Sequence, residues 1–283
     1  VLTSVEKEGL YLDRDFNQKL LEEYKPKIDA ARQAIYDLPR VKKFTKKYNQ
    51  GKIERYIESI YQELEELDYN DPKDKRKIDS RQQKISNIRA GIFTTKKEQE
   101  LIRPLNLGSP VDLPQLMYSD SGFKFPVIKN NESGKPSTDE DTLVELRLTI
   151  KDPESPKAIF LDKLLELRGL QKMYTTYIEG WHEKVQDDSR LHGRYNIHGT
   201  DSNRFSSADP NMQQIPKTSV DPNIKKQLVA PPGYLYMAFD YSQAELRMMA
   251  HLSGDETYLE AFAKGVDPHL GIAAAKYGVS IEE

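Results

Sequence analysis

The chain of 283 residues contains no cysteine. It can therefore form no disulfide and no zinc–thiolate site, and this composition fits a reducing compartment. No apolar run approaches the roughly 20 residues that a membrane helix needs, and the first residues lack the charged and apolar segments of a signal peptide. The net charge is only −3, so total charge gives no indication of a polyanionic partner. The length suits one large or two modest domains.

Charge is distributed unevenly along the sequence. Residues 40–103 contain 17 lysines and arginines against 11 aspartates and glutamates, whereas residues 231–283 contain 3 against 8. A basic module beside an acidic one suits a nucleic-acid grip next to a metal-binding centre. From the counts alone, the simpler explanation of the basic stretch is a solvated helical hairpin with charged faces.

Apolar spacing in residues 40–103 predicts such a hairpin. One stripe has spacings of four, three, four and three, and a second follows after a break at Asn70-Asp71-Pro72. The stripes consist of Ile53, Ile57, Ile60, Leu64 and Leu67, and of Ile78, Ile85, Ile88 and Ile92. The tip between them contains Lys73, Lys75, Arg76, Lys77 and Arg81, which can neutralise phosphates without reading base sequence.

Several further elements are predicted from spacing and capping residues. Residues 2–12 are expected to be extended and to precede a helix, and residues 104–150 are rich in loops, with a helix beginning near Asp139. A helix is expected from Pro156 to about Trp181. Two more are expected from Asp255 to Ala263 and from Asp267-Pro268 to Gly278.

The stretch from Tyr234 to Arg247 is the most informative part of the sequence. Tyr234 to Phe239 predict a strand that ends at Asp240, and a helical run then follows through Glu245. A carboxylate on a rigid strand end suits a divalent metal ion. For a lone aspartate, an ordinary polar strand-to-helix turn is the simpler interpretation.

The octet Asp240-Tyr241-Ser242-Gln243-Ala244-Glu245-Leu246-Arg247, followed by Ala250-His251-Leu252-Ser253-Gly254-Asp255, resembles the first catalytic motif of the family A (polymerase I-like) DNA polymerases. The resemblance covers nearly the whole chain and is strongest in residues 190–216 and 239–269. It implies an α+β fold, in which a protruding helical thumb projects from an incomplete palm with a small, mainly antiparallel sheet. The implied domains are an N-terminal palm segment (1–39), the thumb (40–150), palm with the first catalytic motif (151–254) and the start of the fingers (255–283).

The resemblance also implies residues that contact primer–template DNA. Arg204 matches an arginine placed in the minor groove at the primer terminus, where base-pair acceptors lie at similar positions in every pair. Asn211 and Gln213 match neighbouring primer and template contacts, and Lys172 lies on the helix leading from thumb to palm. Lys75, Arg76, Lys77 and Arg81 complete the expected DNA contacts. The sequence departs from the family pattern at Ser202-Asn203, Phe205 and Ala244.

The same resemblance implies a deoxynucleoside triphosphate site and two Mg²⁺ ions. Asp240 matches the catalytic aspartate that binds both ions, and Tyr241 would offer its backbone carbonyl to the second. Two such ions promote attack of the primer 3′-hydroxyl on the α-phosphate. The residues expected to contact the nucleotide are Tyr241, Ser242, Gln243, Glu245 and His269.

The family's fingers helix and second metal-binding aspartate are not found in the 283 residues, so we expect the chain alone to be inactive in DNA synthesis. A second polypeptide carrying those parts is one expected partner, and a bacterial or phage-infected cytoplasm is the expected location. Two alternatives remain open. The chain could be a non-catalytic DNA-binding module, or a metal-dependent phosphodiesterase, although no second carboxylate cluster with metal-ligand spacing is visible.

Overall fold

A computed structural model describes residues 2–202 and 204–278, in two compact units divided between Val229 and Ala230. The elements of the first unit are α1 (Leu2–Glu8), β1 (Leu10–Tyr11), α2 (Arg14–Tyr36), α3 (Pro39–Glu65), α4 (Pro72–Arg89), α5 (Lys96–Gln99), α6 (Asp112–Tyr118), α7 (Glu140–Leu148), α8 (Pro156–Lys172), the π-helix η1 (Met173–Ile178), α9 (Glu179–Lys184), β2 (Arg190–Leu191), β3 (Arg194–Asn196), β4 (Ser206–Ala208) and α10 (Pro222–Lys226). The second unit contains α11 (Ala244–Ser253), α12 (Glu256–Ala263) and α13 (Pro268–Tyr277).

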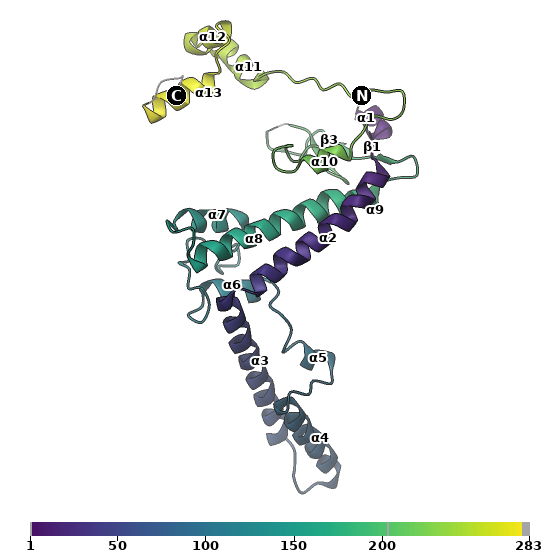
Figure 1. The fold of residues 1–283 in the computed structure, drawn as a ribbon, viewed down its shortest axis with the longest axis vertical. Coiled ribbons are helices and arrows are strands. Elements are labelled where there is room, and N and C mark those ends of the chain that lie inside the picture. Colours follow the sequence, from purple (N-terminus) through teal and green to yellow (C-terminus); the bar gives the residue numbers. More distant parts are fainter. Residues whose placement is uncertain (1, 203, 279–283) are drawn as a thin grey trace. The chain divides into compact units, whose positions relative to one another are not determined.

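Helices α2 and α8 lie side by side and form the body of the first unit (Figure 1). The predicted apolar face of α8 is confirmed, because Leu161, Leu164 and Leu167 are buried in the main core. The chain continues without a break from α8 through η1 into α9, slightly past the predicted end. In this extension the buried Trp181 packs edge-on against Tyr177, with ring centroids 5.6 Å apart.

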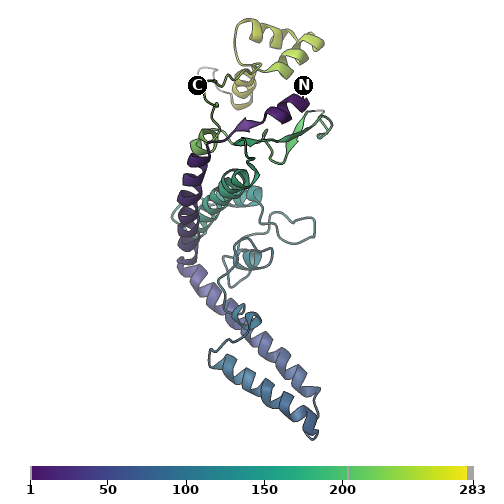
Figure 2. The same ribbon diagram turned by 90° about the vertical axis from the view of Figure 1, so that its right-hand side faces the viewer.

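The predicted helical hairpin is confirmed as α3 and α4, which extend away from α2 and α8 (Figure 2). Asp71 accepts a hydrogen bond from the backbone N–H of Lys73, and Pro72 occupies the first turn, so α4 begins where the break was expected. The facing stripes form a separate apolar cluster of Ile60, Leu64, Ile78, Ile85 and Ile88. Ile92 lies beyond the end of α4 and is 53% exposed, so the second stripe ends earlier than predicted.

The first residues differ from expectation, because residues 2–8 form α1 instead of an extended segment. Gly9 ends this helix with φ of +63°, and a Cβ at this position would lie 2.8 Å from the carbonyl oxygen of Leu191. Only glycine therefore fits the turn that leads into β1. Strand β1 pairs with β2, and β3 pairs with β4, both in antiparallel register.

The predicted strand from Tyr234 to Phe239 is wrong for this structure. These residues form neither strand nor helix, and Leu235 and Phe239 are 91% and 86% exposed. A strand is stabilised by ladder hydrogen bonds and by packing of its faces. No strand of the described residues pairs with this segment, so the ladder hydrogen bonds that would stabilise a strand are not formed.

The predicted helical run through Glu245 is α11, and the two helices with predicted bounds, α12 and α13, begin and end as expected. Asp255 caps α12 through the N–H of Tyr258, and Asp267 caps α13 through the N–H of His269. Gly254 and Gly278 close α11 and α13 in the left-handed conformation. In the part of the chain that the structure describes, no helix has the length and apolarity needed to cross a membrane.

Candidate nucleic-acid and nucleotide sites

The three predicted primer-terminus residues lie around one hollow in the first unit. Arg204, Asn211 and Gln213 line it together with Thr200, Phe205, Ser206, Ser207 and Gln214, and its volume is about 580 Å³. Strands β3 and β4 hold the loop between them, since Arg194 and Ala208 pair at one end and Asn196 and Ser206 at the other. Asn203, where the sequence departs from the family, lies outside the described residues.

Side-chain hydrogen bonds fix the backbone on both sides of this hollow. Thr200 Oγ1 accepts from the N–H of Arg204 at 3.0 Å and donates to its carbonyl at 2.8 Å. Asn211 Oδ1 accepts from the N–H groups of Gln213 (3.0 Å) and Gln214 (3.2 Å). Part of the Asn211 side chain is therefore used to shape the loop, which sequence reasoning did not predict.

Tyr177 is a supporting residue that the sequence did not single out, because it follows the apolar spacing of its helix. Its buried side chain donates from the hydroxyl to the carbonyl oxygen of Gln214 at 2.6 Å. Nearby, Asn17 Nδ2 donates to the carbonyl of Ile178 (2.9 Å) and to Gln227 Oε1 (2.7 Å). Hydrogen bonds therefore connect the π-helix η1 to α2 and to the loop that contains Gln214.

Lys172 is exposed in the last turn of α8 and does not line the hollow. One turn earlier, Arg168 donates to the carbonyl of Thr138, and burial lowers the pKa of its guanidinium against the opposing effect of Glu140 and Asp139. Arg168 therefore fixes the base of α7, whereas Lys172 remains accessible to a phosphate.

The predicted DNA contacts at the hairpin tip lie among carboxylates. Residues 63–81 contain seven aspartates and glutamates against five lysines and arginines. Lys77 forms an ion pair with Asp74 at 2.8 Å, and Arg81 forms one with Glu63 at 2.9 Å. Lys75 and Arg76 are exposed. Contact of these four cations with DNA stays a prediction.

The predicted nucleotide residues gather around a second hollow, which lies in the second unit. Tyr241, Gln243, Glu245 and His269 line it with Ala244 and Leu246, and its volume is about 470 Å³. Ser242 is adjacent in sequence but is not part of the lining. His269 is therefore brought together with residues that precede it by 23 to 28 positions in the sequence.

One carboxylate joins the two sides of this hollow. Asp267 Oδ1 accepts from Gln243 Nε2 at 2.7 Å and from the N–H of His269 at 2.9 Å. The hydrogen bond from the backbone N–H of His269 lowers the pKa of Asp267 below its ordinary value, and the hydrogen bond from Gln243 adds a smaller effect in the same direction. Gln243 has φ of +53°, so its side chain can reach α13 from the position just before α11. On the other face of α11, Arg247 donates to the carbonyl of Ser242 at 2.9 Å and lies over the ring of Phe262.

Asp240 lies on the exposed segment that precedes α11. Its carboxylate and the carbonyl of Tyr241 are oxygen donors of the kind that Mg²⁺ prefers. Among residues 2–202 and 204–278, no group of three or more histidines, aspartates or glutamates is arranged to hold a metal ion. The donors of Asp240 and Tyr241 are suitable in kind for Mg²⁺.

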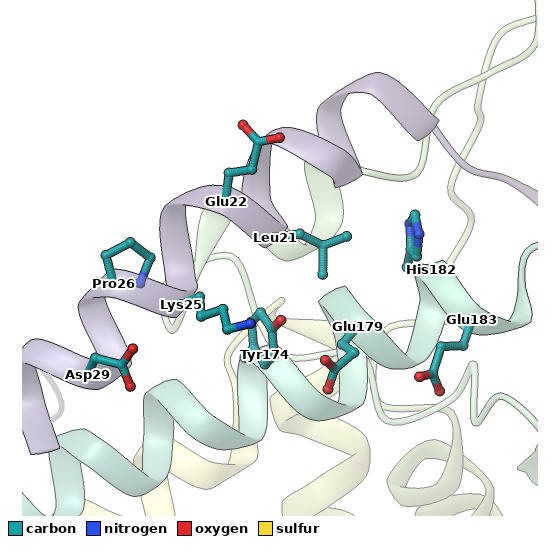
Figure 3. A pocket seen from close by; sticks show the side chains of 9 residues that line it. All are labelled: Leu21, Glu22, Lys25, Pro26, Asp29, Tyr174, Glu179, His182 and Glu183. Atoms are coloured by element: carbon teal, nitrogen blue, oxygen red, sulfur yellow. The ribbon is translucent and has the colours of Figure 1, made fainter.

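A larger groove, of about 870 Å³, lies between α2 and the η1–α9 segment and contains none of the predicted residues. Figure 3 shows its lining, in which Lys25 points toward Tyr174. The other lining residues include four carboxylates, those of Glu22, Asp29, Glu179 and Glu183. Such a surface repels phosphate, so the groove is not a candidate for DNA.

Comparisons with known proteins identify the family of this chain. The model of the family described as DNA polymerase family A matches residues 75–283. The chain belongs to this family, which confirms the resemblance found in the sequence.

Two of the proteins that are similar to this chain in sequence are DNA polymerases. DNA polymerase I of Pseudomonas aeruginosa is 39% identical over 180 residues, covering 63% of this chain and 19% of the relative. The thermostable DNA polymerase I of Thermus aquaticus is 37% identical over 203 residues, covering 71% and 23%. This chain thus spans about a fifth of the length of the curated relatives it matches.

The fold is also similar to a solved polymerase structure. The POL domain of Pol1 from M. smegmatis, solved in complex with DNA primer-template and dNTP, is 26% identical with a TM-score of 0.65. The match covers 100% of this chain and 37% of that chain. The helix-rich fold with small antiparallel ladders is therefore that of part of a polymerase domain.

Proposed function

We propose that this chain takes part in template-directed DNA synthesis, holding primer–template DNA and contributing the first metal-binding carboxylate. In this proposal residues 1–39 and 151–254 belong to the palm, residues 40–150 form the thumb, and residues 255–283 begin the fingers. The observation that carries the proposal is the clustering of residues from two separate sequence blocks around two hollows. Family membership supports it.

At the first hollow, Arg204 would donate to minor-groove acceptors of the terminal base pair. These acceptors occupy similar positions in all base pairs, so the contact tests pair shape and not base identity. Gln213 and the amide nitrogen of Asn211 would contact the adjacent nucleotides, while Lys172 would neutralise a backbone phosphate. The hydrogen bonds of Thr200 and Asn211 to the surrounding backbone would hold this surface in place.

At the second hollow, the deoxynucleoside triphosphate would lie against the first turn of α11 and the start of α13. Gln243 provides no side-chain cap to α11, so the first N–H groups of that helix are available to anionic phosphate oxygens. His269 would add a donor to the phosphates. Glu245 would crowd the sugar at its 2′ position, and Tyr241 and Ser242 would complete the contacts.

Asp240 and the carbonyl of Tyr241 would be ligands of Mg²⁺. When bound, a pair of such ions lowers the pKa of the attacking hydroxyl and stabilises the leaving group. Among the described residues, no group of three or more acidic or histidine side chains is arranged to hold an ion. We therefore infer that further acidic ligands come from outside these residues, with a second polypeptide as one source, and that this chain alone does not extend a primer.

Primer extension with this chain, Mg²⁺ and all four deoxynucleoside triphosphates tests the proposal, together with binding of a labelled primer–template. We expect binding that weakens with salt, and no extension. Extension that disappears in Asp240→Ala would contradict the inferred need for further ligands. Absence of duplex binding at low salt would contradict the proposal itself.

A non-catalytic DNA-binding role is the second candidate, and the scarcity of metal ligands around Asp240 favours it. Salt-dependent duplex binding that is unchanged in Asp240→Ala would support this role. If the proposed polymerase function holds, the bacterial relatives favour a bacterial or phage-infected cytoplasm as the location.

A further inference from the structure

The first half of α3 has an exposed face of lysine side chains. Residues 40–55 contain seven lysines and arginines and one acidic residue, Glu54. Lys43, Lys46 and Lys47 are exposed and occupy positions i, i+3 and i+4, so they share one face of the helix. The opposite face packs into the main core through Val41 and Phe44.

Two neighbouring cations are engaged by the protein. Lys42 forms an ion pair with Asp37 at 2.9 Å, and Arg40 donates to the carbonyl of Gly122 at 2.8 Å. Within residues 2–202 and 204–278, the structure shows no ion pair or side-chain hydrogen bond for Lys43, Lys46 or Lys47. Their charge is therefore available to a ligand.

The surface beside this lysine face is concave. Lys43 and Lys47 line a cleft of about 660 Å³ together with Arg40, Asp120 and Ser121. The one carboxylate of the lining, Asp120, is neutralised by an ion pair with Lys124 at 2.8 Å. The remaining lining residues are apolar and come from the start of α3, from Phe123 and from the start of α8.

The tip of the same hairpin has the opposite charge balance. Its carboxylates outnumber its cations by seven to five in residues 63–81, and two of the cations are in ion pairs. Attraction of a polyanion depends on uncompensated positive charge. The electrostatic contact of the hairpin is therefore expected at its base.

We propose that the lysine face of α3, formed by Lys43, Lys46 and Lys47, binds the phosphate backbone of duplex DNA. This inference rests on the proposed function, according to which the polyanion bound by the chain is duplex DNA. Helix α3 rises about 6 Å between Lys43 and Lys47, so the lysines can reach neighbouring phosphates of one strand. The contact would be independent of base sequence. Helix α3 precedes residues 75–283, so the family match does not assign this role.

The experiment compares two variants with equal loss of charge. One is Lys43→Ala/Lys46→Ala/Lys47→Ala, and the control is Lys19→Ala/Lys96→Ala/Lys151→Ala, which removes three exposed lysines that are not among the expected DNA contacts. Binding of a fluorescein-labelled 30-base-pair duplex is measured by anisotropy between 50 and 200 mM KCl. Circular dichroism and thermal melting check that both variants fold. If the alanine variant unfolds, Lys43→Gln/Lys46→Gln/Lys47→Gln replaces it.

We expect the α3 variant to bind duplex at least tenfold more weakly at low salt, with a salt slope that is smaller by about two to three. The control variant should differ from wild type by less than threefold. If wild type binds duplex and the α3 variant binds equally well, only this inference is overturned. If wild type binds no duplex, the proposed function fails as well.

A labelled poly-glutamate peptide serves as a second probe. Loss of peptide binding in the α3 variant, with duplex binding retained, would assign the lysine face to an acidic protein partner and overturn the proposal. Loss of duplex binding with no peptide binding by wild type would support it.

Discussion

Glu98 is the buried carboxylate whose removal should most affect the segment that follows the hairpin. It accepts hydrogen bonds from the N–H groups of Thr94 (2.7 Å) and Thr95 (3.0 Å) and from Thr94 Oγ1 (3.0 Å). Lys84 of α4 approaches it at 3.3 Å, so the carboxylate joins α5 to the hairpin. Glu98→Ala leaves these donors without an acceptor, and we expect the free energy of unfolding to fall by about 1–3 kcal/mol.

The pH dependence of this contribution follows from the pKa of Glu98. Burial raises the pKa, but hydrogen bonds from Thr95 and Thr94 outweigh this effect and bring it to about 2, below the ordinary value of 4.5. Because the folded-state pKa is the lower one, the stabilisation is fully present above about pH 4.5 and is lost as the pH falls toward 2.

Urea unfolding of wild type, Glu98→Gln and Glu100→Gln at pH 7, 5 and 3 tests this reasoning. Glu100 is an exposed neighbour, and its substitution should leave stability unchanged. Glu98→Gln should be less stable than wild type at pH 7 and pH 5, with a smaller difference at pH 3. A difference below about 0.5 kcal/mol at pH 7, or one that grows as the pH falls, would refute the assignment.

Two further predictions concern the hydrogen bonds that organise the hollows. Asp267→Ala removes the cap of α13 and the acceptor for Gln243, so the first amides of α13 should exchange hydrogen faster than in wild type. Asp267→Asn keeps an Oδ1 acceptor and serves as the control, and equal exchange in both variants would contradict the role of the cap. Tyr177→Phe removes the donor to the carbonyl of Gln214, and the free energy of unfolding by urea should decrease by about 1 kcal/mol. An unchanged midpoint would show that this hydrogen bond contributes nothing to stability.

The helices could be predicted from the sequence because their signals are local. The apolar spacing of Ile60, Leu64 and Ile78 predicted two helices that pack on each other, and Asp71-Pro72 predicted where the second begins. Asp139, Asp255 and Asp267 were likewise identified as helix starts from their positions in the sequence. The short helices α5, α6 and α10 were not predicted, and α1 replaces a segment that was expected to be extended. The end of α1 depends on the contact of Gly9 with a distant strand.

The candidate site could be predicted as a set of residues, because the motifs around Arg204 and Asp240 are specific to one family. The arrangement of these residues in space could not be predicted. The approach of His269 to Tyr241 depends on the Gln243–Asp267 hydrogen bond, and the loop below Arg204 depends on Tyr177. The tip cations, and not the lysine face of α3, were identified from the sequence, because the ion pairs of Lys77 and Arg81 are contacts of the folded chain.

The sequence by itself determined the family, the longer helices and several of their caps, and the residues around which a polymerase site is expected. Only the tertiary structure decided which cations lack partners, which distant residues line a common hollow, and whether Tyr234 to Phe239 form a strand. Helix periodicity and capping depend on neighbours within a few positions of the chain. Strand pairing, ion pairs and hollows depend on contacts between residues far apart in sequence, which no local pattern specifies.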